Sequence, residues 1–294
     1  MGQILVVEAR AKVNLYLRVG KRRENGYHDI QTLFHSIALS DRLEIEGASE
    51  LTVTCSAPET PGGPSNLCYL AARRFCDRFS LSPRVRIHIE KKIPSQAGLG
   101  GGSADAAATL VGLNKLWGVG ASMDELEEIG ASLGADVPFC VRGGAAYAEG
   151  TGEILRPLAP LPDSWLVVVK PSVAISTRAA YGSLDQGGYP AGPDPDLALK
   201  AVRGGKVEAL PGVLYNDFQA VALAREEEIR RAFADLGSCT QGALLCGSGS
   251  ALFGLAADRK QAAGAEMNLR AKGWWAAATH FASEGVVVRP TDPI

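Results

Sequence analysis

The sequence lacks long apolar runs, closely spaced cysteine pairs and an excess of positive charge. No apolar stretch approaches the roughly 20 residues that a membrane-spanning helix needs, so no membrane partner is expected. None of the six cysteines has Cys-x-x-Cys spacing and none of the four histidines His-x-x-x-His spacing, which argues against a structural metal site. The formal net charge of −2 gives no overall basic field, so no nucleic-acid partner is expected.

The first residues do not show the pattern of a secretory signal peptide either. The apolar run at 4–7 is too short for the hydrophobic region of a signal peptide, and a strand-like segment follows at once. No segment rich in Arg and Ser that is typical of a transit peptide precedes it. The sequence therefore predicts a cytoplasmic location, where the cysteines stay reduced.

The size and the order of elements predict a two-domain α+β protein. The chain has 294 residues, of which 46% are hydrophobic, enough for two ordinary hydrophobic cores. Strands and helices alternate without a regular βαβ rhythm, which favours α+β over a doubly wound sheet. We expect the boundary near Gly150 to Gly152, giving domains at 1–152 and 153–294.

Periodicity and capping residues predict the main elements. Alternating polar and apolar residues indicate strands, and N-cap residues followed by apolar residues at helical spacing indicate helices. Strands are expected at 12–19, 84–89, 165–169, 277–281 and 286–289, and helices at 66–79, 104–117, 122–134, 219–236 and 259–272. Residues 182–213 are rich in Gly and Pro, so much of this stretch is expected to be a surface loop.

A glycine-rich segment between a strand and a helix carries the strongest chemical signal. Residues 93–107 read IPSQAGLGGGSADAA, with glycines at 98, 100, 101 and 102. Glycine lets backbone N–H groups approach an anion closely, and the start of the helix adds free donors and a positive dipole end. Ser103 offers a hydroxyl to a phosphate oxygen or Mg²⁺ and is expected to cap the helix. Lys91 and Lys92 add positive charge nearby.

Two known phosphate-loop patterns do not fit this segment. No Lys follows the glycines as in the P-loop, and Ser103 stands where G-x-G-x-x-G has its last glycine. A flexible turn is the alternative. Four glycines in five positions, leading directly into an alanine-rich helix, favour anion binding.

Polar residues in two N-terminal segments are further candidates. Residues 11–17 (AKVNLYL) place Lys12 and Asn14 on one face of a strand, although a solvated strand face explains most such patterns. Tyr27 and His28 follow a turn, where Tyr stacks well on a base and His hydrogen-bonds to its edge. Taken alone, this second segment indicates a turn with a satisfied histidine.

Two later segments are also ambiguous on their own. Asp136 lies in apolar company within LGADVPFCV, and such a carboxylate is either structural or a general base. Residues 246–254 (CGSGSALFG) form a second glycine loop, which closes over phosphates or is a plain β-turn.

In their order along the chain, these segments resemble the GHMP small-molecule kinases, a family that includes galactokinase and the homoserine, mevalonate and phosphomevalonate kinases. The similarity spans nearly the whole chain and is greatest to the branch that acts on 4-diphosphocytidyl-2-C-methyl-D-erythritol. Its most specific parts are NGYHDIQTLF at 25–34, GLGGGSADAA at 98–107 and SLGADVPF at 132–139.

The resemblance implies a fold and a reaction. The N-terminal domain is expected to look like a ribosomal-protein domain and the C-terminal domain like a ferredoxin-type sandwich, with the active site in the cleft between them. Members of this branch transfer the γ-phosphoryl group of ATP to the 2-hydroxyl of their substrate, in the non-mevalonate route to isoprenoid precursors. ATP, Mg²⁺ and an acceptor with a cytidine diphosphate group are the implied cofactors and partner.

The resemblance also implies roles for individual residues. Asp136 would be the general base and Lys12 its partner, while Ser103 is a guess for a Mg²⁺ ligand. Substrate contacts are implied at Asn14, Tyr27, His28, Thr177 and Tyr181, where Tyr27 and Tyr181 would stack on the two faces of the cytosine ring. ATP contacts are implied at Asn66, Pro94, Ser95, Gln96, Ala97, Gly98, Leu99, Gly100, Gly101, Gly102, Ser103 and Asn114.

Three other functions compete with this reading. Another GHMP kinase of the mevalonate or homoserine type has no need for a cytosine-binding segment such as NGYHDIQT. A catalytically silent metabolite sensor would not need Lys12, Asp136 and the glycine loop, and all three are present. A nucleic-acid-binding protein is opposed by the slightly acidic charge balance. The roles of Asn216 and Asp217 and the oligomeric state stay open.

Overall fold

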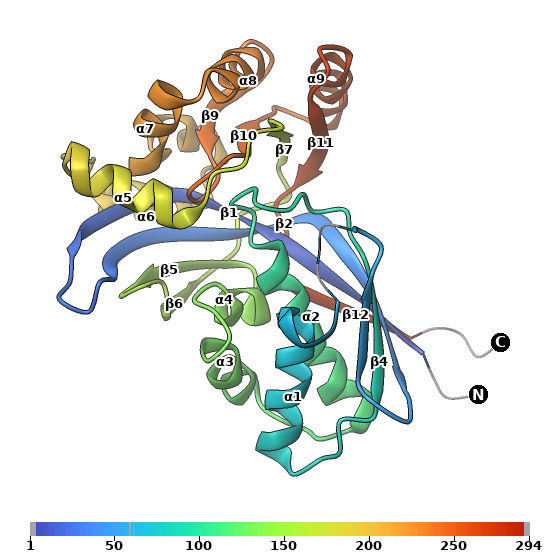
Figure 1. Cartoon of the computed structure of the whole chain (residues 1–294). Coiled ribbons are helices and arrows are strands. Elements are labelled where there is room, and N and C mark those ends of the chain that lie inside the picture. The colour runs from blue at the N-terminus through green and yellow to red at the C-terminus, as the bar shows by residue number, and fades with distance from the viewer. Residues whose placement is uncertain (1–3, 59, 61, 291–294) are drawn as a thin grey trace.

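The computed structural model describes residues 4–58, 60 and 62–290 and arranges them around two β-sheets. A larger sheet of eight strands carries helices on one face, and a smaller sheet of four strands stands against its other side (Figure 1). Strands and helices are mixed along the chain without a regular βαβ repeat, which confirms the predicted α+β class.

The larger sheet is built on a long antiparallel hairpin. Its strands are β1 (Leu5–Arg22), β2 (His28–Gly47), β3 (Thr52–Cys55), β4 (Val85–Glu90), β5 (Ala145–Glu149), β6 (Ile154–Leu158), β8 (Tyr215–Asn216) and β12 (Val286–Pro290). The order is β12-β1-β2-β4-β3, with β5 and β6 continuing from β2 and β8 beside β1. Residues 11–17 of β1 are all buried, because α2 and α4 pack against this strand and helices from the C-terminal half also contact it.

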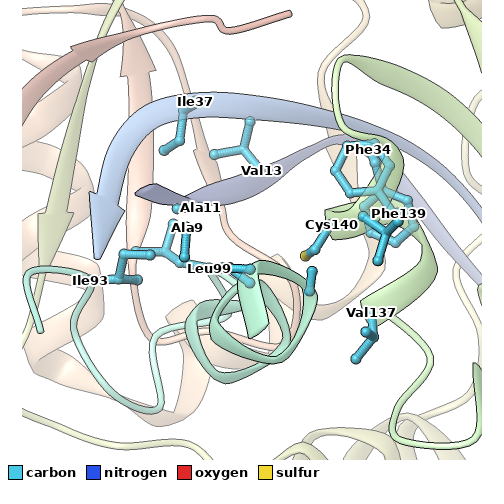
Figure 2. Close-up of a cluster of buried hydrophobic side chains, with 14 of the residues drawn as sticks. Ala9, Ala11, Val13, Phe34, Ile37, Ile93, Leu99, Val137, Phe139 and Cys140 are labelled. Carbon is cyan, nitrogen blue, oxygen red and sulfur yellow. The ribbon is translucent and has the colours of Figure 1, made fainter. Parts of the chain in front are cut away.

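Four helices cover the larger sheet: α1 (Leu67–Phe79), α2 (Gly101–Trp117), α3 (Met123–Ala131) and α4 (Val137–Arg142). A short 3₁₀ turn, η1 (Gly63–Ser65), precedes α1. Asn66 caps α1 by accepting the backbone N–H of Cys68, and Ser122 and Glu125 form a capping box at α3, as their sequence patterns predict. Figure 2 shows side chains of β1, β2 and α4 meeting in the core, where the rings of Phe34 and Phe139 stack 4.9 Å apart.

The smaller sheet contains β7 (Trp165–Lys170), β9 (Gln241–Leu245), β10 (Leu252–Leu255) and β11 (Trp275–His280), all antiparallel in the order β11-β7-β10-β9. Helices α8 (Glu227–Gly237) and α9 (Arg259–Ala271) pack on it. Along the chain, these elements follow in the order β7, α8, β9, β10, α9, β11. This βαββαβ order is the ferredoxin-like pattern that the family resemblance implies.

No single cut of the chain separates the two sheets. A division at residue 152 falls inside the β5–β6 hairpin, whose strands pair antiparallel. Strands β8 and β12, from the C-terminal half, both pair with β1. The predicted domains 1–152 and 153–294 therefore share the larger sheet, because β1 finds hydrogen-bonding partners in both halves.

The loop prediction for residues 182–213 is wrong over most of its length. Helix α5 (Thr177–Gly187), helix α6 (Pro195–Arg203) and the 3₁₀ turn η2 (Val207–Gly212) occupy most of it. The side chain of Asp194 caps α6, and Pro195 occupies its first turn. A count of Gly and Pro overlooks such helix start signals. Burial of the apolar residues of α6 then stabilises the helix.

Two helix boundaries also differ from the prediction. The expected helix at 219–236 is two helices, α7 (Asp217–Arg225) and α8, with the chain extended at Glu226. Helix α2 begins at Gly101, three residues earlier than expected, so Ser103 lies in its first turn and Gly100 takes the N-cap position. A glycine there adopts the left-handed conformation (φ 71°) that leads the loop into the helix.

Among residues 4–58, 60 and 62–290, no helix combines the length and apolarity needed to cross a membrane.

His35, on β2, makes folding sensitive to acid. Its ring is buried, its Nδ1 lies 2.8 Å from the carbonyl of Ser36, and its Nε2 accepts the backbone N–H of Leu161 at 2.9 Å. Burial lowers the pKa of His35 from 6.5 to about 4. Below pH 6.5 the unfolded chain binds a proton that the folded chain does not bind until near pH 4, so acid favours unfolding.

We expect His35 to lower the free energy of unfolding by as much as about 3 kcal/mol between pH 6.5 and pH 4. Urea unfolding of the wild type and of His35→Gln over this range measures it, because the stability gap between them should narrow as the pH falls. His88→Gln, on β4, is the control and should keep the wild-type pH dependence. A constant gap for His35→Gln would contradict the assignment.

Candidate active site

A cavity of about 600 Å³ lies between the larger sheet with its glycine-rich loop and elements of the C-terminal half of the chain. Its walls come from β1, the glycine-rich segment, the start of α2, the N-cap of α4, helix α5 and the loop between β9 and β10. Most of the predicted site residues line it together: Lys12, Asn14, Asn66, all residues from Pro94 to Ser103, Asp136, Thr177 and Tyr181. The fold thus gathers residues from both halves of the chain.

The glycine-rich loop is anchored by apolar side chains. Ile93, Ala97 and Leu99 are 1–2% exposed, and Figure 2 shows Ile93 and Leu99 beside the small side chains of Ala9 and Ala11 on β1. The carbonyl of Leu99 also accepts the backbone N–H of Lys12 at 3.0 Å. Because these side chains are buried in the core, the polar backbone between them is held against the cavity.

The N-terminus of α2 faces the same cavity. Gly100, Gly101, Gly102 and Ser103 line it, and no side chain caps the helix among the described residues. The first N–H groups of a helix have no partner within the helix, and the helix dipole adds a partial positive charge there. This combination suits a phosphate group.

A lysine and an aspartate meet across the cavity. The Nζ atom of Lys12 lies 3.4 Å from Oδ2 of Asp136, with the two side chains 5% and 32% exposed. Asp136 occupies the N-cap position of α4, but its side chain accepts no capping hydrogen bond. Its carboxylate therefore stays available to the cavity instead of serving the helix.

A chain of hydrogen bonds within β1 and β2 holds the side chain of Lys12 in place. Its Nζ donates to Oδ1 of Asn14 at 2.9 Å, and Nδ2 of Asn14 donates to Oγ1 of Thr32 at 2.8 Å. That hydroxyl donates to the carbonyl of Tyr16 at 2.7 Å. Register shifts flank Lys12 and Asn14 in the β1–β2 ladder, and such bulges re-aim side chains. The lysine is thus held in one direction.

The second glycine loop, between β9 and β10, packs directly on the first. The backbone N–H of Ala251 donates to the carbonyl of Ala97 at 3.1 Å, and a Cβ at Gly98 would lie 1.9 Å from the carbonyl oxygen of Cys246. Gly247 and Ser248 line the cavity. The loop therefore forms part of the cavity wall, which favours contact with phosphates over a plain β-turn.

Asn216 supports this second loop. Its Nδ2 donates to the carbonyls of Leu245 and Gly247, both at 2.8 Å, while its Oδ1 accepts the N–H of Phe218. The neighbouring Asp217 accepts the backbone N–H of Val19 at 2.6 Å. The pair thus ties α7 to the loop and to β1, which the sequence did not indicate.

The aromatic residues predicted for a base are only partly brought together. Tyr181, on α5, lines the cavity, and burial raises the pKa of its hydroxyl to about 12. The ring of His28 stacks on Tyr181 with centroids 4.7 Å apart, and its Nε2 lies 2.9 Å from Oδ1 of Asp185. Neither His28 nor Tyr27 lines the cavity, and Tyr27 is 65% exposed.

Asn114 is the one predicted ATP contact that the structure keeps away from the cavity. It lies near the C-terminal end of α2, about 20 Å along the helix from Gly101. Its amide donates to the carbonyl of Ala121 and accepts the N–H of the same residue, both at 2.9 Å. Its role here is to hold the chain that leaves the helix.

Some lining residues were not predicted. Asp105 lies within the 98–107 motif but was not singled out as a site residue, Phe218 carries no signal of its own, and Ser248 was only implicit in the second glycine loop. Of the two lysines before the first loop, Lys91 lines the cavity, whereas the side chain of Lys92 is 58% exposed.

Comparison with known proteins assigns the family. A family model for the N-terminal domain of GHMP kinases matches residues 66–144, which include the glycine-rich loop and Asp136. The chain is 45% identical over 264 residues to a 4-diphosphocytidyl-2-C-methyl-D-erythritol kinase from Moorella thermoacetica, covering 88% of this chain and 92% of that protein. The chain belongs to this kinase family.

Solved structures agree with the assignment. A crystal structure of a 4-(cytidine 5'-diphospho)-2C-methyl-D-erythritol kinase superposes with a TM-score of 0.79 at 36% identity, covering 94% of this chain and 98% of that one. A homoserine kinase from Cytophaga hutchinsonii superposes with a TM-score of 0.73 at 17% identity, covering 98% of both chains. The second likeness shows that the kinase shares the GHMP fold and says nothing of its substrate.

Gly98 is the point at which the two glycine loops touch, so a methyl group there should be costly. Its φ is +75° and an added Cβ would overlap the carbonyl of Cys246. We expect Gly98→Ala to lower the free energy of unfolding by about 2 kcal/mol or more and to weaken nucleotide binding. Urea denaturation followed by circular dichroism measures the first effect.

Gly102→Ala is the matched control. An added Cβ at Gly102 would contact only the end of Leu67, at 3.5 Å, and alanine favours a helix. Its stability should equal or exceed that of the wild type. Equal stability of Gly98→Ala and the wild type would contradict the proposed contact.

Proposed function

We propose that this kinase transfers the γ-phosphoryl group of ATP to the 2-hydroxyl of 4-diphosphocytidyl-2-C-methyl-D-erythritol, giving the 2-phosphate and ADP for isoprenoid precursor synthesis. The observation that carries the proposal is the Lys12–Asp136 pair, which faces the same cavity as the glycine-rich loop and the N-terminus of α2. An acid–base pair and an anion site within one cavity fit phosphoryl transfer to an alcohol.

Asp136 is proposed as the general base. The acceptor is a tertiary alcohol, hindered and weakly acidic, so a positioned carboxylate that takes its proton assists attack on phosphorus. The ammonium of Lys12, 3.4 Å away, orients this carboxylate and attracts the developing negative charge on oxygen. Asn14 contributes by holding Lys12 at 2.9 Å and by lining the cavity beside it.

The nucleotide is proposed to bind along the glycine-rich loop, with Asn66 and residues 94–103 around it. The free N–H groups at the start of α2 would bind phosphate oxygens, and their positions are fixed before binding because Ala97 and Leu99 are buried. Such preorganised donors stabilise the charge that moves during transfer without having to reorganise.

Mg²⁺ fits this site as a companion of the nucleotide. No group of three His, Cys, Asp or Glu side chains able to hold a metal ion occurs within 4–58, 60 and 62–290. The cavity does present oxygen donors, the hydroxyl of Ser103 and the carboxylate of Asp136. Mg²⁺ is often held by one or two protein oxygens together with substrate phosphates, and it would offset phosphate charge.

The cytidine end is proposed to bind where the cavity is apolar and aromatic. Leu17, Ile30, Tyr181 and Phe218 line that part, and Thr177 adds a hydroxyl. The ring of His28 stacks on Tyr181 and extends this aromatic surface beyond the cavity wall. The roles of Tyr27 and His28 at the base remain predictions, since the cavity wall does not include them.

ADP release with Mg-ATP and a panel of acceptors tests the substrate. We expect turnover with 4-diphosphocytidyl-2-C-methyl-D-erythritol, because the cavity has an aromatic end for the base, and none with mevalonate or homoserine. Turnover of mevalonate or homoserine alone would overturn the substrate and keep the kinase. Nucleotide binding without turnover of any acceptor would instead favour a metabolite sensor.

Replacing the proposed base tests the mechanism. Asp136→Asn keeps the shape of the side chain but cannot take the proton, so kcat should fall by a factor of about 10² to 10⁴. Affinity for ADP should change little. Asp163→Asn, an exposed carboxyl outside the cavity, is the control and should match the wild type. A kcat within a few-fold of the wild type for Asp136→Asn would assign proton transfer elsewhere.

A further inference from the structure

A buried cluster of three charged side chains lies beneath the glycine-rich loop. The Nζ atom of Lys91, which follows β4, lies 2.5 Å from Oδ2 of Asp41 on β2 and 2.7 Å from Oδ2 of Asp105 on α2. The three side chains are 9%, 0% and 4% exposed. The proposed mechanism uses none of them.

Asp41 also holds the backbone at the entrance to the loop. Its Oδ1 accepts the backbone N–H of Lys92 at 2.5 Å and that of Ile93 at 2.8 Å, directly before the loop begins at Pro94. One carboxylate thus binds two consecutive backbone groups and a lysine. These contacts fix the direction in which the chain leaves β4.

The same lysine reaches the other end of the loop. Asp105 lies in α2, just after the glycines and Ser103, so the ammonium of Lys91 connects the segment that enters the loop with the helix that leaves it. Lys91 and Asp105 both line the cavity, whereas Asp41 is fully buried. Asp41 therefore cannot touch a ligand and acts through its partners.

The charges in this cluster are costly for a purely structural element. Burial opposes a charge on Lys91, but Asp105 and Asp41 outweigh it and raise the pKa of the ammonium. Burial raises the pKa of Asp105, whose Oδ1 is buried without a hydrogen-bond partner among the described residues. Apolar residues in place of a buried ion pair are often no less stable, so a role at the site is the better account.

We propose that Asp41 is a positioning residue for nucleotide binding: through Lys91 and the N–H groups of 92 and 93 it holds both ends of the glycine-rich loop. This inference rests on the proposed binding of ATP at that loop. A phosphate site made of backbone N–H groups works only while those groups keep their directions. Asp41 supplies that constraint from outside the cavity.

The double variant Asp41→Asn/Lys91→Met tests the proposal. It removes one charge of each sign, so the net charge of the cluster is unchanged. Asp105 loses its ammonium partner, but burial raises the pKa of its carboxyl, so it can take up a proton and the protein is expected to fold. The KM for ATP and the Kd of a fluorescent ADP analogue should rise by a factor of about 10 to 100. The KM for the cytidyl acceptor should stay close to the wild-type value, because the acceptor binds at the Tyr181 end of the cavity.

Lys92→Met is the matched control. Lys92 is the neighbouring lysine, and its ammonium is exposed and 3.9 Å from Glu90, so its loss should leave both KM values unchanged. The single variant Asp41→Asn should raise the KM for ATP like the double variant, because the amide cannot form the ion pair. If only Lys91→Met raised it, Lys91 would be a direct ligand contact and the role of Asp41 would be overturned.

Thermal melting separates positioning from simple stability. A double variant that melts lower than the wild type but binds ADP with wild-type affinity at a temperature where it is folded would overturn the proposal. Failure of the proposed function looks different, because the wild type itself would then bind no ADP or turn over no acceptor. A wild type that binds ADP, together with a folded double variant and a folded Asp41→Asn that both bind it weakly, supports the inference.

Discussion

The rest of the site depends on the pairing of the buried ammonium of Lys12 with its polar neighbours. The ammonium contacts Asp136, Asn14 and the ring of Phe34, whose centroid lies 5.2 Å away. A buried cation is costly unless it is paired and hydrogen-bonded. These neighbours are therefore needed for the stability of the fold as well as for the proposed reaction. The two glycine loops pass close to the same side chain, because added Cβ atoms at Gly100 and Gly247 would lie 3.0 Å and 3.4 Å from it.

Strand β1 transmits this constraint to the whole molecule. It carries Lys12 and Asn14, it pairs with strands from both ends of the chain, and the carbonyl of Leu99 accepts a hydrogen bond from it. The second glycine loop, held by Asn216, closes against the first at Gly98. The cavity is therefore formed where β1 and the two glycine loops meet, and no segment forms it alone.

Much of the site could be predicted, although by two different routes. The residues themselves indicated an anion site at the glycine loop, because glycines before a helix are a local signal. The pairing of Lys12 with Asp136 came from the family resemblance, and the distance of 3.4 Å agrees with it. Asn114 lies outside the cavity, and a matching position in a motif does not show which end of a helix faces the cavity. Residues 182–213 were misread because the start signal of α6, Asp194 followed by Pro195, was outweighed by the surrounding Gly and Pro.

The sequence by itself determined the local elements: the cap at Asn66, the capping box at Ser122 and the glycine entry into α2. Each depends on residues within a turn or two, and these interact in much the same way wherever the segment is placed. Only the tertiary structure decided that Gly98 meets Cys246, that Asn216 holds the second loop, and that Asp41 and Asp105 share the ammonium of Lys91. These partners lie far apart in the chain, and side chains from distant segments meet only after packing of the apolar core has fixed where each segment lies.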